Sequence, residues 1–393
     1  MAVTESLGRY TLFLLLTAVS ILLLPSLTRA EDYASAQFYT HAFNNDTTVY
    51  TGVFALNKDF NLRTSGYVKY TVDFINPSFG EGDDDKKGKK KKGKTNAVSS
   101  ASAANASGSN SDTRNELTVG LTHDFANIFG AELYFDASRE NDYTSYTPTI
   151  TLKKDLFTKN TTITASYSGS FDTVSGEFLP ETKSRTTYNY FLGLTQLLSP
   201  RMFFQLGYTL TESSGQMSEG IRLVAINGAD ASTCTDISAT CVGERFPASR
   251  TRRAYTAGLS RYFTFEGLGG IFERAALKLT FRYYDDDWKI KSFMAGLEYD
   301  KHIYDNMLLT LNYRYYTQGK AFFVKDAYTS ADAFTSASPQ LENLDTNLIG
   351  VKGTYFFPWL KSRTNSLEAK YEFYRESRGV FANVLMVGLK VNY

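Results

Sequence analysis

The chain has 393 residues and a nearly balanced charge, with 42 Lys and Arg against 41 Asp and Glu. Its mean hydropathy is -0.28, although it contains 27 Tyr and 29 Phe. This composition excludes a bundle of membrane-spanning helices, since each helix needs about 20 consecutive apolar residues. The near-zero net charge argues against a nucleic-acid partner.

The first thirty residues have the pattern of an export signal. Arg9 precedes an apolar stretch from Thr11 to Leu24, and Pro25 and Ala30 follow it. A basic start, an apolar centre and a small residue at the cleavage point are typical of secretory signal peptides. We expect residues 1–30 to be a signal peptide that is cleaved after Ala30, with an uncleaved anchor helix as the alternative. Residues 31–393 then form the exported protein, which we expect in the outer membrane.

After the export signal, apolar and polar residues alternate in segments of about ten residues, a period of two that is typical of β-strands. In one such segment, Leu277, Leu279 and Phe281 share a face opposite Lys278 and Thr280. Soluble sandwiches alternate too, but their strands have about five to six residues, whereas tilted membrane-spanning strands need about nine to eleven. The predicted fold class is therefore all-β, a transmembrane antiparallel up-and-down β-barrel.

Sixteen strands are predicted, or fourteen if the first hairpin around Asn44 is absent. In chain order they span residues 34–43, 48–57, 62–74, 114–124, 129–139, 146–155, 160–171, 185–197, 201–213, 250–264, 274–285, 288–300, 306–317, 344–356, 365–376 and 384–393.

The four longest connections between these strands all fall on one side of the barrel. They are Ile75–Thr113, Thr173–Ser184, Ser214–Ser249 and Gln318–Asn343. This favours long extracellular loops and short periplasmic turns. Within the first of them, residues 80–113 form a low-complexity segment rich in Lys, Ser and Ala. We interpret it as a basic loop that contacts lipopolysaccharide phosphates, or as a solvated spacer without a ligand.

The end of the chain carries a second targeting pattern. Leu389, Val391 and the terminal Tyr393 occupy alternate positions of the last predicted strand. This arrangement resembles the C-terminal signal that the bacterial outer-membrane assembly machinery recognises, with Tyr in place of the usual Phe. We therefore expect outer-membrane lipid and this machinery to be partners of the protein.

Several stretches of the chain have a characteristic order and spacing. They are Tyr190–Ser199, Glu244–Arg250, Arg282–Trp288, Tyr313–Phe323 and, more weakly, Asn96–Ala104. In these stretches the chain, over roughly residues 185–328, resembles a bacterial outer-membrane family known only as a domain of unknown function, number thirty-five-seventy. The resemblance implies a barrel in the outer membrane of a Gram-negative bacterium, without a known substrate, and it suggests a periplasmic redox partner.

Six charged residues fall on the polar face of the predicted strands, which is the lumen face of a membrane barrel. One hypothesis is that they create a transverse field that selects solutes by charge. The alternative is a structural network of ion pairs that stiffens a filled barrel. These lumen residues are Arg252, Arg282, Arg314, Glu132, Asp136 and Glu298.

Cys234 and Cys241 are the only cysteines, and they lie in the third long loop with six residues between them. In an oxidising compartment this pattern predicts a disulfide. The run from Asp285 to Asp287 offers oxygen ligands for a hard cation, but aspartates are also favoured in tight turns. The sequence has no haem-attachment motif, and we predict neither a metal site nor a cofactor.

These features favour a porin-like channel for passive passage of small polar solutes or ions. The alternative is a barrel that serves as a scaffold or sheath for an envelope redox partner, a cytochrome or a flavoprotein. A surface hydrolase is the least favoured reading, because His41, His123 and His302 have no convincing catalytic partners in the sequence. We therefore predict that the protein is not an enzyme.

Overall fold

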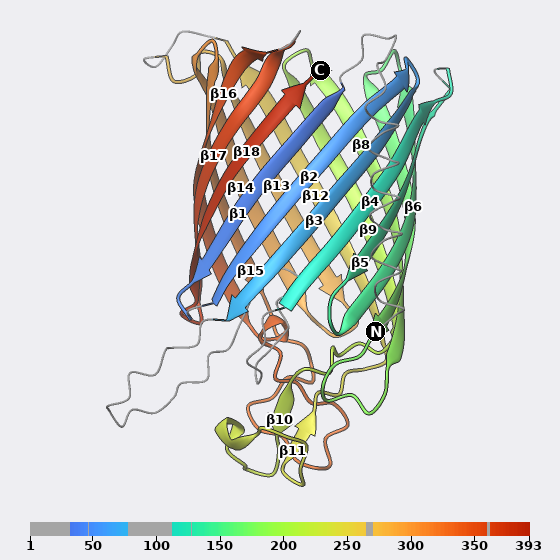
Figure 1. The fold of residues 1–393 in the computed structure, drawn as a ribbon, viewed down its shortest axis with the longest axis vertical. Coiled ribbons are helices and arrows are strands. Elements are labelled where there is room, and N and C mark those ends of the chain that lie inside the picture. The colour runs from blue at the N-terminus through green and yellow to red at the C-terminus, as the bar shows by residue number, and fades with distance from the viewer. Residues whose placement is uncertain (1–31, 46, 78–111, 127, 265–269, 360–361) are drawn as a thin grey trace, which may run out of the picture.

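The computed structural model describes the chain except for residues 1–31, 46, 78–111, 127, 265–269 and 360–361. The predicted signal peptide and nearly all of the predicted 80–113 segment lie outside the described residues. The rest forms a closed antiparallel barrel of sixteen strands (Figure 1). The all-β barrel prediction is confirmed, including the first hairpin, so the fourteen-strand alternative is wrong.

Each barrel strand pairs with its neighbours in the sequence, apart from the closing pair of β1 and β18 and the pair of β9 and β12. Strands β10 (Leu223–Ala225) and β11 (Cys241–Gly243) form a separate hairpin in the connection between β9 and β12. Strand β4 begins at Asp112 and so includes the last two residues of the predicted 80–113 segment. The barrel strands are β1 (Tyr33–Phe43), β2 (Thr47–Asn61), β3 (Thr64–Pro77), β4 (Asp112–Asp124), β5 (Gly130–Arg139), β6 (Tyr143–Leu156), β7 (Thr161–Val174), β8 (Lys183–Ser199), β9 (Met202–Gly215), β12 (Ser249–Phe263), β13 (Ala275–Asp286), β14 (Lys291–Tyr304), β15 (Met307–Gln318), β16 (Leu344–Trp359), β17 (Ser362–Glu376) and β18 (Phe381–Asn392).

The first and last strands close the barrel. Strand β1 pairs with β18 along its whole length, from Tyr33 opposite Asn392 to Phe43 opposite Ala382. Beyond the strand, the backbone N–H of Tyr393 donates to the carbonyl of Asp32 at 3.0 Å. Closure removes the free edges whose backbone groups would be unpaired in lipid.

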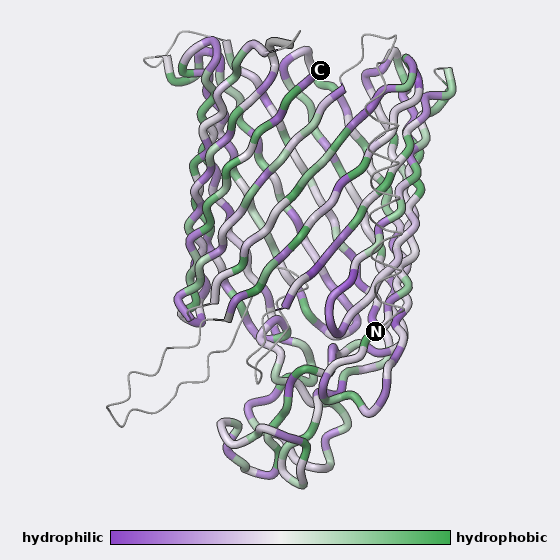
Figure 2. The backbone as a smooth tube through the Cα atoms, in the orientation of Figure 1, coloured by the Kyte–Doolittle hydropathy of each residue, from purple (hydrophilic) through white to green (hydrophobic). Residues whose placement is uncertain are grey.

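Strict alternation gives the wall two chemically different faces (Figure 2). Leu297, Tyr313 and Ile349 are successive partners across β14, β15 and β16, and they are 41%, 44% and 61% exposed. Such a row of exposed apolar side chains marks the face that contacts lipid. Tyr208, Tyr255 and Tyr283 form a similar row on β9, β12 and β13, with successive ring centroids 5.1 Å and 6.3 Å apart.

The proposed assembly signal fits this geometry. Leu389 and Val391 share the outer face of β18 with Val387, which is 55% exposed, and Tyr393 follows directly after the strand. Recognition by the assembly machinery stays a prediction.

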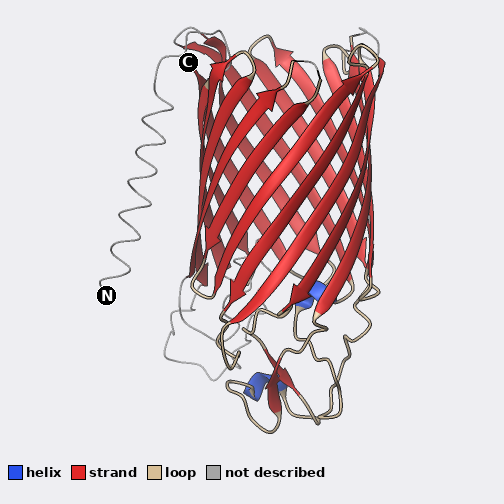
Figure 3. Ribbon diagram, turned by 90° about the vertical axis from the view of Figure 1, so that its right-hand side faces the viewer, coloured by secondary structure: helices blue, strands red, loops and turns tan. Residues whose placement is uncertain are grey.

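The two ends of the barrel differ. The C-terminus and the short turns lie at the upper end in Figure 1, and the long connections gather at the lower end, which we call extracellular as in other outer-membrane barrels (Figures 1 and 3). Among the described residues, no helix is long and apolar enough to cross a bilayer. The two short 3-10 helices are η2 (Ala231–Thr233) and η3 (Pro339–Leu341).

At the extracellular end, the β9–β12 connection (216–248) and the β15–β16 connection (319–343) pack together, and we call this unit the cap. Backbone bonds of 3.0 Å and 2.9 Å join Arg245 and Thr335 in both directions. The buried residues Met217, Phe323 and Leu341 of the cap share one small apolar core with Trp288 and Ile290 of the β13–β14 turn. The cap is therefore packed against the rim of the barrel.

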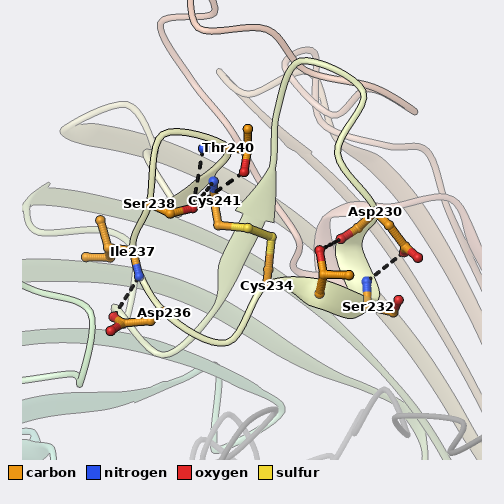
Figure 4. Close-up of a disulfide and its surroundings, with 9 residues drawn as sticks. Asp230, Ser232, Cys234, Asp236, Ile237, Ser238, Thr240 and Cys241 are labelled. Atoms are coloured by element: carbon orange, nitrogen blue, oxygen red, sulfur yellow. Dashed lines mark hydrogen bonds between the residues drawn. A yellow bond between two sulfur atoms is a disulfide. The ribbon is translucent and has the colours of Figure 1, made fainter.

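The two cysteines lie in the cap. Cys234 and Cys241 form a disulfide with their Cα atoms 5.5 Å apart (Figure 4). The bridge joins the end of η2 to the start of β11, and it closes the loop between them.

The two faces of β13 offer a test of the barrel in a membrane. Phe281 is 43% exposed on the outer face, whereas its neighbour Thr280 lies on the inner face. We expect Phe281→Arg to lower the free energy of unfolding in lipid vesicles by about 2–4 kcal/mol, because it places a charge against hydrocarbon. Thr280→Arg is the matched control and should lower it by less than about 1 kcal/mol, since exposed polar surface tolerates charge. Equal losses in urea titrations of the two variants would contradict the assignment of the faces.

Candidate functional site

The register places all six predicted lumen residues on the inner face of the barrel. Arg252, Arg282 and Arg314 lie on β12, β13 and β15. Glu132 and Asp136 lie on β5, and Glu298 lies on β14. The structure brings these residues to one wall surface, but it does not gather them into a single cluster.

The three acidic residues have partners on neighbouring strands. Glu132 forms an ion pair with Lys153, and Glu298 forms one with Lys278. Asp136 accepts a hydrogen bond of 2.5 Å from the hydroxyl of Thr118. Two of the three carboxylates are therefore charge-compensated locally.

The three arginines, in contrast, lack carboxylate partners. Within the part of the chain that the structure describes, Arg282 and Arg314 form no hydrogen bond or ion pair, and both side chains are exposed to the barrel interior. Arg252 has no ion pair there either, and its buried Nε has no hydrogen-bond acceptor. This part of the inner wall therefore carries uncompensated positive charge.

Asp286 is the residue opposite Arg252 on the neighbouring strand, but its carboxylate is occupied by other partners. Its side chain is fully buried and pairs with Arg250 at 2.6 Å. It also accepts from the hydroxyl of Tyr284 at 2.7 Å and from the backbone N–H of Ile290 at 2.8 Å. Arg250 in turn stacks over the ring of Trp288, 4.3 Å from its centroid. Arg252 is left without this counter-charge although it is opposite Asp286 in the register.

Arg250, Arg252 and Arg282 line a cavity of about 300 Å³ between the barrel wall and the cap, which we call the arginine pocket, whereas Arg314 is not among its lining residues. The donors of the pocket include arginine guanidinium groups and several hydroxyl and amide groups. Guanidinium groups pair with carboxylate or phosphate oxygens in a planar, two-point geometry. The pocket can therefore hold a small anion. Its lining residues are Thr209, Thr211, Arg250, Arg252, Arg253, Ala254, Arg282, Tyr284, Ile290, Ser292, Tyr316, Gln318, Gln340 and Leu341.

The acidic strand β5 lies across the barrel from β15, which carries Arg314. The ring has sixteen strands, and seven of them lie between β5 and β15 in each direction around it. The two strands are therefore diametrically opposite. Arg314 is four residues before the extracellular end of β15, and Asp136 is three residues before that of β5. The two residues therefore lie on opposite walls and both in the extracellular half of their strands.

The structure also shows charged contacts that the sequence analysis missed. Arg114 on the inner face of β4 lies 3.6 Å from Asp73 and 3.7 Å from Glu140, and it pairs with Glu116. Alternation along β4 could have placed Arg114 and Glu116 on the lumen face. The contact with Glu140 depends on the β4–β5 register, which alternation does not determine.

The aspartates at the β13–β14 turn, which the sequence offered as cation ligands, form ion pairs and hydrogen bonds within the protein. Asp285 pairs with Arg253 at 3.1 Å on the outer side of the strand. Asp287 accepts from the backbone N–H of Thr251 at 3.0 Å. Together with the Arg250 pair, these contacts anchor the turn to the start of β12.

Glu244 holds the two halves of the cap together. Its buried carboxylate accepts from the backbone N–H of Ala337 at 2.9 Å, and Arg222 lies 4.0 Å away. Burial raises the pKa of Glu244 to about 7, Arg222 and the Ala337 bond oppose this shift, and Glu219 adds to it. The carboxyl group therefore titrates close to neutral pH.

The fold and the two-faced wall define the class of the protein, a transmembrane β-barrel of the outer-membrane type. The model of the family described as "Protein of unknown function (DUF3570)" matches residues 11–180 and 179–390, and the chain belongs to this family. Among curated proteins, none has a sequence that matches the chain.

Solved structures with a similar fold include receptors and channels. The OpdK channel of Pseudomonas aeruginosa, solved with vanillate, is 7% identical over 94% of this chain and 100% of its own, with a TM-score of 0.43. The monoaromatic hydrocarbon channel CymD is 8% identical over 93% and 89%, also at 0.43. The ferric enterobactin receptor of P. aeruginosa is 10% identical over 90% and 54%, at 0.42. The chain thus spans about half the length of that receptor.

The pair of Arg250 and Asp286 should be essential for the stability of the pocket. Replacement Asp286→Asn leaves the buried Arg250 without its counter-charge, and such a loss typically costs about 3–5 kcal/mol. We expect that decrease in urea unfolding. The double variant Arg250→Gln with Asp286→Asn removes both charges and should recover part of the loss. A double variant no more stable than the single one would contradict the role of the charge pair.

The titration of Glu244 predicts a pH-dependent cap. Because its pKa in the folded protein is raised, its contribution is fully present below the ordinary value of 4.5 and is lost as pH rises through about 7. We expect the free energy of cap opening to fall by about 2 kcal/mol between pH 5 and pH 8. Hydrogen exchange of the Thr335 and Ala337 amides, corrected for intrinsic rates, measures it. Glu244→Gln keeps a hydrogen-bond acceptor but cannot ionise, so the pH dependence should disappear in this variant. If the pH dependence is unchanged, it does not arise from Glu244, and the neighbouring Glu219 is then the candidate.

Proposed function

We propose that the protein is a porin-like channel through which small polar solutes and ions, preferentially anions, cross the outer membrane by passive diffusion. A barrel of sixteen strands is wide enough to enclose an aqueous lumen. Its inner face carries charged and polar side chains along nearly every strand, and such a lining lowers the barrier for hydrated solutes.

The observation that carries this proposal is the imbalance of pairing on the inner wall. Glu132 and Glu298 have lysine partners, whereas Arg282 and Arg314 have no partner among the described residues. Uncompensated positive charge on a low-dielectric wall raises the local concentration of anions. The arginine pocket then provides a weak binding site, where guanidinium groups replace part of the water around a passing anion.

Single-channel recording in planar bilayers tests this proposal. We expect steady single-channel steps that favour chloride over potassium. The triple variant Arg252→Gln, Arg282→Gln and Arg314→Gln should lower the anion-to-cation permeability ratio by about two- to tenfold, because wall charge sets the local ion concentration.

A matched control is available on the same strand as Arg252. Arg261 lies on the outer face of β12, opposite Leu277, and outside the arginine pocket, so Arg261→Gln should leave the permeability ratio unchanged. A correctly folded barrel that gives no conductance would contradict the channel. Co-purification of a cytochrome or flavoprotein with such a silent barrel would instead favour the sheath.

A further inference from the structure

A second charged cluster lies on the opposite part of the extracellular rim and has the reverse sign. Asp112 begins β4, and Glu140 and Asp142 lie in the turn between β5 and β6 (Figure 1). One carboxylate oxygen from each of the three residues lies within 4.8 Å of the other two. Three oxygen ligands thus converge from two separate segments.

Two of these carboxylates are buried with unsatisfied oxygens. Asp112 is 3% exposed, and the side chain of Glu140 is 5% exposed. Asp112 Oδ2 and Glu140 Oε1 are inaccessible to water and accept no hydrogen bond from any described residue. Buried carboxylate oxygens without donors are costly unless a proton or a cation compensates them.

The protein does not supply enough positive charge for this compensation. Five carboxylates gather here, those of Asp73, Asp112, Glu116, Glu140 and Asp142, against the two cations Arg114 and Lys69, which leaves an excess of three negative charges. Arg114 is shared by three of these acids, and neither Asp112 nor Asp142 has an ion pair among the described residues.

We propose that Asp112, Glu140 and Asp142 form a binding site for a hard divalent cation, Ca²⁺ in preference to Mg²⁺. Carboxylate oxygens are the ligands that both ions take, and water completes the coordination. Calcium binds oxygens at about 2.3–2.6 Å in flexible geometry, so two ligands on opposite sides of it are up to about 5 Å apart. Magnesium requires about 2.0–2.1 Å and a near-ideal octahedron, and it usually keeps several waters and takes only one or two protein carboxylates, so a site of three carboxylates suits calcium better.

The bound ion would tie together the rim of the barrel. It joins the first residue of β4 to the β5–β6 turn, and the backbone carbonyl of Asp142 already accepts from the N–H of Ser175 at 2.8 Å. One cation would therefore join the start of β4 to the β5–β6 turn, which is already hydrogen-bonded to the β7–β8 connection. This site is separate from the arginine pocket, which lies on β9 and β12–β15.

Titration calorimetry with CaCl₂ tests the site in the full-length, chelator-treated barrel in zwitterionic detergent. We expect one site with a Kd of about 0.1–1 mM, the range of extracellular calcium modules. Asp142→Asn and Glu140→Gln should each weaken binding about tenfold or more, since each removes one of three charged ligands. The control variant is Glu132→Gln. Glu132 lies on β5, the strand that precedes Glu140, but outside the cluster, so this variant should bind Ca²⁺ like the unmodified protein.

Each result decides one part of the proposal. Absence of Ca²⁺ binding, or binding that persists in both Asp142→Asn and Glu140→Gln, overturns the site. Tighter binding of MgCl₂ than of CaCl₂ overturns the choice of ion. Should the buried Glu140→Gln variant fail to fold, as judged by gel mobility before and after heating, Asp142→Asn in the half-buried turn still gives the test.

Discussion

The need to pair every backbone N–H and C=O inside a lipid bilayer determines the rest of this structure. A sheet satisfies that need only when it has no free edge, and here β1 and β18 meet over eleven residue pairs to remove the last one. Once the wall is closed, successive side chains must point alternately to lipid and to the interior. The aromatic and aliphatic rows outside and the charged rows inside are both consequences of that closure.

Which charged side chains on the inner wall stay unpaired then depends on how the available partners of opposite charge are distributed among them. Asp286 is held by Arg250, Tyr284 and Ile290, so Arg252 has no ion pair among the described residues. Elsewhere on the rim, Arg114 pairs with Asp73, Glu116 and Glu140, and Asp112 and Asp142 have no ion pair in the described part of the chain. The arginine pocket and the acidic cluster thus arise in the same way with opposite signs. Each is a place where a small ion replaces a missing side chain.

The sequence was sufficient for the strands and for the face that each residue occupies, because both follow from a period of two within ten or so residues. It placed Arg282, Arg314 and Asp136 on the inner wall for this reason. It did not show which charges meet, since partners such as Arg250 and Asp286 are 36 residues apart and depend on the strand register. The contact of Glu244 with Ala337 spans 93 residues between two loops, and no local pattern predicts it.

The arginines and the acidic cluster also give the barrel a direction. Both lie near the extracellular rim, whereas the charges toward the other end, such as Lys58 with Asp32 and Lys278 with Glu298 and Asp300, are paired. An ion entering from outside meets fixed charge at once, and an ion entering from the periplasm meets it only after crossing most of the wall. A pore with its charge at one mouth rectifies: currents of equal and opposite voltage differ in size.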